Sequence, residues 1–406
     1  MTHGAEAATS GSELADPASR KPLRNFVLVS TMVSTAYLIF IVSVLASTFI
    51  EEFNLSRFEL GLIGSLNTAV GAITAPATGR LTDRIGPRLS SVTAQLIAAF
   101  GLALVALSQS VIMLIIAACI LGLPQGWGNP TTNALIAERV EPGRRGTITG
   151  IKQSGVTLGV FLAGLTLPSL AEALGWRWAV GLYAAAFAVI GLVPLLLPAH
   201  VAPFTTTDAT TADVESKPYN QRAVWLIALY AFLMGTSGGA ISRFLALFAE
   251  EEAGLSKSTA GLVVALTGIG GMAARIGAGK LAEKRVAPLK LLSILALIGT
   301  TVSMLLMLTL EGGAWLLWPV AALFAIGHTA WNAVAMLAII LGVPKAHAGR
   351  ASGAVMVGFL GGLAVGAPLA GLTIDATDSY QPVWVATLVL AAVAAMVAEF
   401  ARRTAT

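Results

Sequence analysis

The sequence predicts an all-α integral membrane protein with twelve transmembrane helices in two pseudo-symmetric six-helix bundles. This prediction rests on the composition, the number of apolar segments and an internal duplication. Of the 406 residues, 56% are hydrophobic and only 11% are charged, whereas soluble domains carry about 25% charged residues. A mean hydropathy of +0.81 leaves too little polar surface to cover a globule in water. We therefore expect the lipid bilayer to be the main solvent of this chain.

The composition also argues against several other classes of protein. The single cysteine, Cys119, cannot form an intramolecular disulfide, so a secreted disulfide scaffold is not expected. The pI is near 9.3, but the formal net charge is only +4 and the basic residues form short clusters between apolar runs. The sequence contains no nucleophile-base-acid arrangement, metal cluster or phosphate loop. It therefore predicts no enzyme, no nucleic-acid partner, no cofactor or metal, and no ATP-driven pump.

Twelve apolar segments are long enough to cross a bilayer, which needs about 20 residues of helix. They cover residues 26–50, 60–79, 89–108, 111–135, 147–170, 179–198, 223–248, 258–278, 289–310, 315–342, 350–373 and 382–400. The longest polar gap divides them six and six. We expect a flexible cytoplasmic tail at 1–25, an N-terminal bundle at 26–198, a cytoplasmic linker at 199–222, a C-terminal bundle at 223–400 and a cytoplasmic tail at 401–406.

The orientation follows from the distribution of lysine and arginine, because loops rich in these residues stay in the cytoplasm. With the N-terminus inside, the external loops hold only Arg57, Arg177 and Lys257. The cytoplasmic side holds Arg20, Lys21, Arg24, Arg80, Arg84, Arg88, Arg139, Arg144, Arg145, Lys217, Arg222, Lys280, Lys284, Arg285, Lys290, Lys345, Arg350, Arg402 and Arg403. We therefore predict a multi-pass protein of the cytoplasmic membrane with both termini in the cytoplasm.

The two halves of the chain are repeats. At an offset of 200, residues 51–81 match residues 251–281 at Glu51, Glu52, Leu55, Ser56, Gly61, Leu62, Leu66, Gly71, Gly79 and Leu81. Further along, the offset becomes 203, and Asn129, Gly155 and Gly159 recur as Asn332, Gly358 and Gly362. Each half has an even number of segments, so the repeat is parallel about an axis along the membrane normal. Such repeats allow two bundles to rock about a shared central site.

Residues 79–88, with the sequence GRLTDRIGPR, lie between the second and third segments. They resemble the cytoplasmic signature loop of the major facilitator superfamily, with a degenerate copy at residues 279–284. The resemblance covers essentially the whole chain after the tail. It implies a conformational motif made of Gly79, Asp83, Arg84, Gly86 and Arg88. The Asp83 carboxylate would latch the N-terminal end of the eleventh helix, where unpaired N–H groups favour an anion. A topology-fixing basic turn is the alternative interpretation.

Two other patterns of this superfamily are only partly present. Many members carry an arginine in the fourth helix ahead of a glycine-rich stretch, but Cys119 occupies that place here. The fifth segment is rich in glycine but lacks the Gly-Pro pair of antiporters, and small residues equally serve close helix packing. The resemblance therefore does not imply proton coupling through the arginine or a direction of transport. Within the superfamily, the sequence is most similar to the organic-anion and cyanate-type branches.

Three basic residues fall inside the predicted membrane segments: Lys152, Arg243 and Arg275. None of the 21 acidic residues lies in the middle of such a segment. Charges inside a membrane are costly and usually functional. Basic groups without carboxylates favour an anionic substrate, because the ligand then supplies the missing countercharge. We therefore predict that Lys152 is the main anion-binding residue and that Arg243 assists it from the other bundle.

Each of these charges also has a simpler interpretation. The stem of Lys152 is long enough to reach toward the cytoplasmic interface, but Gly155 and Gly159 share its helical face and indicate a packed side. Arg243 is placed to reach the outer rim, and Arg275 to reach the cytoplasmic interface. The counterpart of Lys152 in the second repeat is Val355, so the duplicated architecture by itself does not require a charge there.

Uncharged polar residues gather near the middle of a few segments. The candidate substrate-binding residues beside the two charges are Tyr37, Gln125, Asn129, Gln153, His328, Trp331 and Asn332. In the family that the chain resembles, helices one, four, seven and ten line the cavity, which agrees with this distribution. Hydrogen bonds between helices and core packing are the alternatives for each residue. His328 is also the candidate for proton linkage, since imidazole has an unperturbed pKa of about 6.5.

These observations predict a secondary active transporter that moves a small, carboxylate-like organic anion by rocker-switch alternating access. We expect a monomer in the lipid bilayer, with protons or a counter-transported anion as the coupled species. Two alternatives remain open: an efflux carrier for neutral or amphipathic compounds, and a non-transporting membrane receptor on the same fold. Counterflow of a labelled substrate separates the receptor from both carriers.

Overall fold

The computed structural model describes residues 20–141, 144–199 and 220–405. The predicted N-terminal tail and central linker lie largely outside these residues. All regular secondary structure in the described residues is helical. The α-helices are α2 (Lys21–Val44), α3 (Ala46–Phe53), α4 (Arg57–Ala106), α5 (Val111–Arg139), α6 (Arg145–Leu174), α7 (Trp176–Leu192), α8 (Gln221–Glu251), α9 (Lys257–Lys284), α10 (Pro288–Gly312), α11 (Leu317–Gly327), α12 (Trp331–Gly342), α13 (Lys345–Thr377) and α14 (Gln381–Ala405).

Eleven helical stretches of the described chain are long and apolar enough to cross a membrane, and one of them accounts for two crossings. Helix α4 has 50 residues, which corresponds to about 75 Å and more than twice the hydrocarbon layer. Gly86 interrupts it with φ 80° and ψ 157°, and Pro87 follows. Glycine tolerates this positive φ, and proline has no N–H group to continue the helix. The structure thus confirms twelve crossings.

The tenth crossing is broken, whereas the sequence predicts one continuous segment over residues 315–342. Helix α11 ends at Gly327 and α12 begins at Trp331. Arg275 of α9 donates from Nε to the carbonyl of Thr329 in this break, at 3.0 Å. A carbonyl released from a helix inside a membrane needs such a donor. Arg275, which the sequence predicts to reach the cytoplasmic interface, therefore donates to a carbonyl in this break instead.

The chain forms two compact units that do not follow the two repeats. Unit 1 contains Met1–Leu38, Asn67–Gly159 and Leu174–Phe204, and unit 2 contains Ile39–Leu66, Val160–Ala173 and Thr205–Thr406. Unit 2 therefore includes parts of four helices of the first repeat: the end of α2, all of α3, the start of α4 and the end of α6. At this end of unit 2, elements of both repeats pack together.

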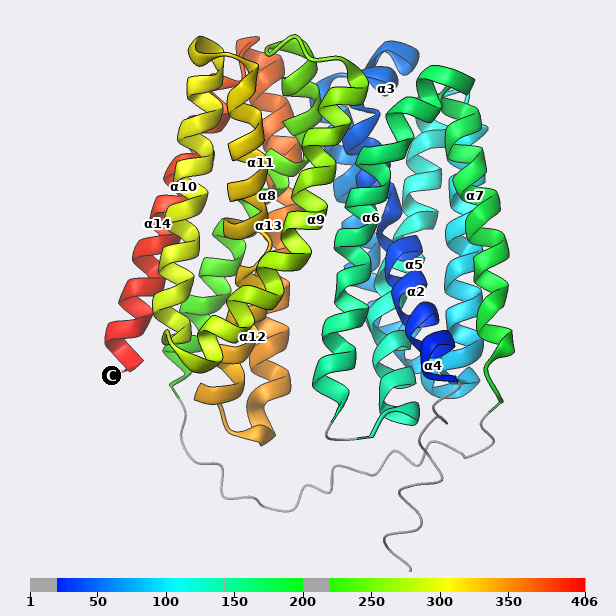
Figure 1. The fold of residues 1–406 in the computed structure, drawn as a ribbon, viewed down its shortest axis with the longest axis vertical. Helices are drawn as coiled ribbons and strands as arrows, with labels where there is room; N and C mark the ends of the chain where they lie inside the picture. Colours follow the sequence, from blue (N-terminus) through cyan, green and yellow to red (C-terminus); the bar gives the residue numbers. More distant parts are fainter. Residues whose placement is uncertain (1–19, 142–143, 200–219, 406) are drawn as a thin grey trace, which may run out of the picture. The chain divides into compact units, whose positions relative to one another are not determined.

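Close helix packing in unit 2 depends on small residues. Helix α8 packs against α13 and α14, and α10 lies beside α14 (Figure 1). Gly358, Gly362 and Gly366 of α13 recur every four residues, and a Cβ at any of them would collide with backbone carbonyls of α8. Their spacing keeps all three on one helical face. The small-residue stripe of the eleventh crossing is therefore a helix-packing surface, as expected for membrane helices.

In unit 1, glycines likewise allow α4 and α5 to pack closely. A Cβ at Gly122 would meet the side chain of Val70 at 2.6 Å, and a Cβ at Gly126 would collide with the backbone of Gly71. The glycine-rich stretch of α5 therefore brings this helix against α4.

Candidate functional site

The Lys152 side chain of α6 is the most informative polar group of unit 1. It is only 1% exposed. Its ammonium group donates to Oδ1 of Asn129 at 3.1 Å and also to Oδ1 of Asn133, both on α5. The two asparagines are four residues apart, so they occupy one face of α5. We define these three residues as the Lys152 cluster.

The surrounding sequence explains why this lysine is buried. Gly155 shares the face of Lys152, and a Cβ there would meet the carbonyl oxygen of Val29 in α2 at 2.6 Å. The absence of a side chain at Gly155 lets α6 approach α2 closely, as the spacing of the glycines predicts. The lysine stem therefore lies on a packed face, and its charge has to find partners inside the protein.

The Lys152 cluster lacks a carboxylate. Both partners of the ammonium are neutral amide oxygens, and no acidic residue described in unit 1 forms an ion pair with it. A lysine ammonium has three donors, of which the asparagines accept two. A buried charge without a countercharge is costly, so the cluster is suited to bind an anion.

Three other predicted residues of unit 1 lie in different surroundings. The Gln153 amide donates to Oδ1 of Asn129 at 3.5 Å, which joins it to the Lys152 cluster. Tyr37 is buried and stacks on Tyr183, with ring centroids 4.6 Å apart. The side-chain amide oxygen of Gln125, Oε1, is buried without a hydrogen-bond partner. Of these three residues, the structure brings Gln153 to Asn129 and Lys152.

The signature loop of unit 1 lies on α4 around the Gly86 kink. Thr82 Oγ1 accepts a hydrogen bond from the Trp127 indole at 2.8 Å, which ties the loop to α5. Arg88 donates to the carbonyl of Leu195 at 2.6 Å. The Asp83 carboxylate is exposed and forms no hydrogen bond or ion pair with the described residues of its own unit. Gly79 and Arg84 lie on the same helix, ahead of the kink.

In unit 2, His328 is enclosed where α11 ends. Its Nε2 is 3.1 Å from Ser237 Oγ of α8, and its ring stacks on Phe324 with centroids 4.8 Å apart. Gly238 and Gly299 leave room for the ring, since a Cβ at either would lie 3.3 Å or less from it. His328 Nδ1 is buried without a hydrogen-bond partner. The imidazole therefore connects α8 to the break in the tenth crossing.

Arg243 of α8 is also buried in unit 2, with 5% of its surface exposed. Its Nη1 donates to the carbonyl of Ile39 at 3.0 Å, and its Nε has no acceptor. Gly64 provides the space, because a Cβ there would collide with the guanidinium group. No carboxylate in the described part of unit 2 pairs with Arg243. Glu250, which lies seven residues further along α8, is therefore not its partner in this structure.

The remaining two candidates lie on α12. Trp331 is 1% exposed and packs edge-on against Tyr230 and Phe359, with centroids 5.8 and 5.1 Å away. Asn332 donates to the sulfur of Met356 at 3.7 Å. Trp331 is thus a member of the hydrophobic core of unit 2, and Asn332 has a weak partner.

Sequence reasoning missed two residues that complete these contacts. Asn133 contacts Lys152, and a signal for it existed, because it follows Asn129 by one helical turn on the same face. Ser237 contacts His328, and it lies in the glycine-rich run Gly235–Gly239, which reads as a helix-weakening segment. Pairing Ser237 with a residue 91 positions away requires the tertiary structure.

Twelve hydrophobic crossings with basic residues buried among them are typical of polytopic membrane transporters. Within this class, the family model described as the Major Facilitator Superfamily matches residues 27–367. The chain belongs to the Major Facilitator Superfamily. The resemblance found in the signature loop is thereby confirmed, and the protein is a membrane transporter and not an enzyme.

Curated relatives of the chain have different transport roles. It is 27% identical over 312 residues to the multidrug resistance protein MdtG of Proteus mirabilis strain HI4320, covering 74% of this chain and 77% of that protein. It is 24% identical over 253 residues to the nitrite extrusion protein of Bacillus subtilis strain 168, covering 62% of each chain. These relatives support transport of a small molecule and leave its chemical class open.

Solved structures have the same fold. A mutant form of the nucleoside transporter NupG superimposes with a TM-score of 0.78 at 14% identity, covering 93% of this chain and 99% of that one. A bacterial homologue of the human lysosomal transporter Spinster, in an inward-facing and occupied conformation, gives a TM-score of 0.73 at 18% identity, covering 96% and 98%. At these identities the comparison establishes the fold alone.

Proposed function

We propose that this transporter moves a small organic anion across the cytoplasmic membrane and that Lys152 supplies the main positive charge for it. Transport is secondary, by alternating access of the rocker-switch type. The coupled species are protons or a counter-transported anion. Arg243 contributes a second positive charge.

The observation that carries this proposal is the burial of the Lys152 ammonium against neutral amide oxygens, with no acidic residue of the described part of unit 1 paired with it. An anion that reaches this group supplies the missing countercharge, and the side-chain N–H groups of Asn129 and Asn133 add donors to its oxygens. The second buried charge, Arg243, likewise has no carboxylate partner in the described part of its unit. The nitrite extrusion protein among the relatives is named for an anion, which agrees with this chemistry.

Counterflow into proteoliposomes tests the proposal. Vesicles loaded with an excess of an unlabelled anion receive a labelled trace of the same anion outside, using ¹⁴C-labelled mono- and dicarboxylates and ¹⁵N-labelled nitrite detected by mass spectrometry. We expect the wild-type protein to accumulate at least one of these anions transiently. Lys152→Gln keeps the size and hydrogen-bonding capacity of the side chain but removes its charge, and we expect it to abolish the accumulation.

Lys290→Gln is the matched control, because Lys290 is an exposed lysine at the start of α10, outside both copies of the signature loop. It should leave the counterflow unchanged. Normal anion transport by a well-expressed Lys152→Gln protein would refute the role of Lys152. Wild-type protein without counterflow of any anion would refute the substrate class.

Efflux of neutral or amphipathic compounds is the second candidate function. It is favoured by the similarity to the multidrug resistance protein MdtG over 77% of that protein. The same vesicles, loaded with an uncharged amphipathic fluorescent dye, separate the two functions. Under the anion proposal, dye leaves protein-containing and empty vesicles equally fast. Faster dye release that Lys152→Gln preserves would establish the efflux function instead.

We also propose that both termini face the cytoplasm, which follows from the charge bias of the loops. Thr82 is buried against Trp127 and is unsuited as a reporter. The exposed residues Glu52 and Lys284 suit this purpose better. In a Cys119→Ser background, an impermeant maleimide on intact cells should label Glu52→Cys and not Lys284→Cys. The reverse result would invert the topology.

A further inference from the structure

Four basic side chains surround a cleft at one end of unit 1. Lys21 and Arg24 come from the first turn of α2, Arg139 from the end of α5, and Arg144 from the segment directly before α6. The cleft has about 260 Å³ of space outside the protein atoms, part of it open to solvent. Among the described residues that line it, Glu141 supplies the one carboxylate. We define this feature as the basic cleft.

Two of the four basic residues are buried. Arg139 is 0% exposed and Arg24 is 4% exposed. Arg24 Nη1 donates to the carbonyl of Arg139 at 3.2 Å, at the C-terminal end of α5, where the helix dipole favours a cation. Arg139 donates to the carbonyl of Pro198 and pairs with Glu138 at 3.1 Å. Contacts with α2, α5 and the chain after α7 therefore hold both guanidinium groups in place.

The charges around the basic cleft are not balanced. Its four basic side chains stand against two carboxylates, Glu141 in the lining and Glu138 beside Arg139. Like charges that are held close together repel each other, and the repulsion increases where protein atoms replace water. An anion in the cleft lowers this repulsion and accepts charge-assisted hydrogen bonds. The cleft is therefore suited to bind an anion.

The size of the basic cleft limits what can enter it. The part that is wide enough for a water-sized sphere measures about 20 Å³, which is room for about one water molecule. An oxygen atom of a phosphate group is of similar size. The cleft can therefore receive the oxygens of a phosphate group, while the rest of the ligand stays outside. A solute that has to be enclosed whole does not fit.

The surroundings of the basic cleft are apolar. Val140 and Ile148 line it, and both belong to a buried hydrophobic cluster of unit 1. The 3₁₀ helix η3 (Val193–Leu196) comes shortly before Pro198 and leaves Leu195 and Leu196 exposed. Large apolar side chains on the surface of a membrane helix face the acyl chains of lipids. The cleft thus lies where basic groups border a lipid-facing surface, which is the depth of phospholipid headgroups.

Buried apolar residues separate the basic cleft from the Lys152 cluster. On α6, Ile148 comes one helical turn before Lys152. On α5, Leu135 and Ile136 lie between Asn133 and Arg139, and they are buried, as is Ile148. A ligand in the cleft therefore does not contact the residues that we propose to bind the transported anion.

We propose that the basic cleft binds the phosphate group of an anionic phospholipid. Arg24 and Arg139 supply fixed guanidinium groups, which match the geometry of phosphate oxygens. Lys21 and Arg144 add charge at the rim. A zwitterionic lipid such as phosphatidylcholine has the same phosphate group, but its choline would bring a cation beside these four residues. The cleft therefore prefers phosphatidylglycerol, whose headgroup adds no positive charge.

Native mass spectrometry of the full-length protein in detergent tests the proposal. Phosphatidylglycerol and phosphatidylcholine with identical acyl chains are titrated separately, and the bound lipids are counted. We expect the wild-type protein to bind phosphatidylglycerol about fivefold more tightly or better. The double variant Lys21→Gln/Arg144→Gln should weaken this binding roughly 25-fold, because each basic residue near a membrane surface contributes about fivefold. Binding of phosphatidylcholine should change little.

Two further variants separate a specific site from general attraction to charge. The double variant Arg285→Gln/Lys290→Gln removes the same charge from exposed residues at the end of α9 and the start of α10. It should leave the affinity for phosphatidylglycerol unchanged. Glu141→Gln removes the carboxylate from the lining and should raise the affinity about twofold or more, an effect of opposite sign that loss of packing does not produce.

Equal losses of affinity in the two double variants would overturn the basic cleft as a site. Glycerol 1-phosphate, the soluble form of the same headgroup, should not displace the lipid even in large excess. Displacement would make the ligand a soluble phosphate compound and would overturn the assignment to a lipid. Lipid counting requires no transport. Loss of this inference therefore leaves the anion counterflow proposal intact, and failure of counterflow leaves this inference intact.

Discussion

The Lys152 cluster of the first repeat and the equivalent positions of the second repeat lie on corresponding helices but carry different side chains. At the offset of 203, Asn129 and Lys152 correspond to Asn332 and Val355. The first pair is joined by a hydrogen bond to a buried ammonium at 3.1 Å. In the second repeat, Val355 is buried in the hydrophobic core and Asn332 contacts the sulfur of Met356 at 3.7 Å.

This difference indicates that helix packing alone does not require a charged residue at position 152. Both positions are buried, so the packing of these helices is compatible with an apolar side chain at either one. An apolar residue there has no desolvation cost, whereas an ammonium does. A charge in only one copy is therefore best explained by a role that the other copy lacks. Four substitutions test this interpretation, and Lys152→Gln is expected to have the largest effect.

Lys152→Gln should have the largest effect on transport. Truncating one partner of a buried charge pair costs about 2 to 5 kcal/mol, which corresponds to a loss of affinity of roughly 30- to 5000-fold. Uptake of the labelled anion should fall below detection. Val355→Ala, the change at the equivalent position, should lower the melting temperature and leave the affinity unchanged. A comparable loss of affinity in both variants would make Lys152 a packing residue.

Arg243→Lys should weaken transport without abolishing it. Lysine keeps the charge but loses the planar fork, and its shorter reach weakens the contact with the Ile39 carbonyl. A hydrogen bond from a charged group contributes about 1.5 to 3 kcal/mol, so we expect anion affinity to fall by about tenfold or more. Isothermal titration with the transported anion measures this change. Wild-type affinity in the variant would confine Arg243 to a structural role.

Asp83→Asn should slow transport several-fold while the affinity for the anion changes little. The signature loop implies that Asp83 acts as a conformational latch, and a charge at a helix terminus contributes about 0.3 to 2 kcal/mol. A shift of this size changes the balance of two nearly equal conformations. Initial counterflow rates and equilibrium binding, measured on the same preparation, distinguish the two effects. Equal loss of rate and affinity would place Asp83 in the binding machinery.

His328→Gln should have the smallest effect on rate and a specific effect on pH dependence. Glutamine retains a hydrogen-bonding side chain toward Ser237, so the contact with α8 at 3.1 Å can be kept. If His328 takes part in proton linkage, the pH profile of uptake between about pH 5 and 8 becomes flatter in the variant. An unaltered profile would assign proton linkage to another group or to the substrate.

Most of the fold followed from patterns that are local in the sequence. Residues 79–88 were predicted to lie between the second and third crossings, and the structure has a non-helical residue, Gly86, within this stretch. The glycines beside Lys152 indicated a packed face, and Gly155 does contact α2. Predictions failed where a helix is interrupted without a local signal. The break before Trp331 is supported by the Arg275 side chain, which lies 54 residues from Thr329 in the chain.

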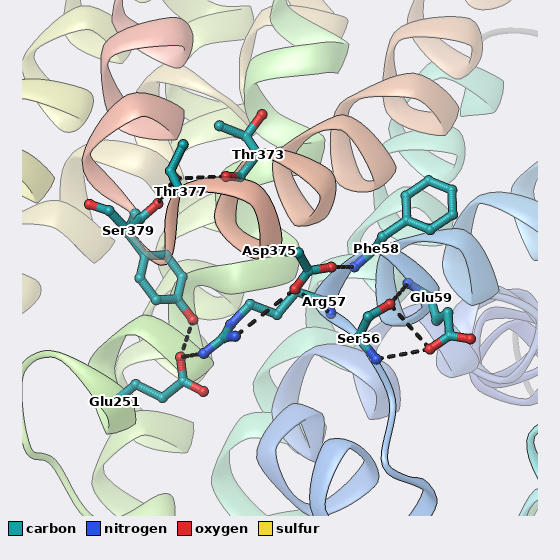
Figure 2. Close-up of polar contacts among 10 residues, drawn as sticks. Ser56, Arg57, Phe58, Glu59, Glu251, Thr373, Asp375, Thr377 and Ser379 are labelled. Carbon is teal, nitrogen blue, oxygen red and sulfur yellow. Dashed lines mark hydrogen bonds and ion pairs between the residues drawn. The ribbon is translucent and has the colours of Figure 1, made fainter.

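The membrane class, the twelve crossings, the duplication and the family could all be predicted from the amino-acid sequence, because hydropathy, glycine spacing and repeated residues are properties of short segments. It also singled out Lys152, because a charge within an apolar segment is visible without coordinates. The groups that these residues contact could be identified only in the folded chain. At the start of α4, the Arg57 N–H donates to Asp375 of α13 at 3.0 Å (Figure 2). These residues are 318 positions apart, and no local periodicity encodes such a meeting, since it depends on how complete helices pack.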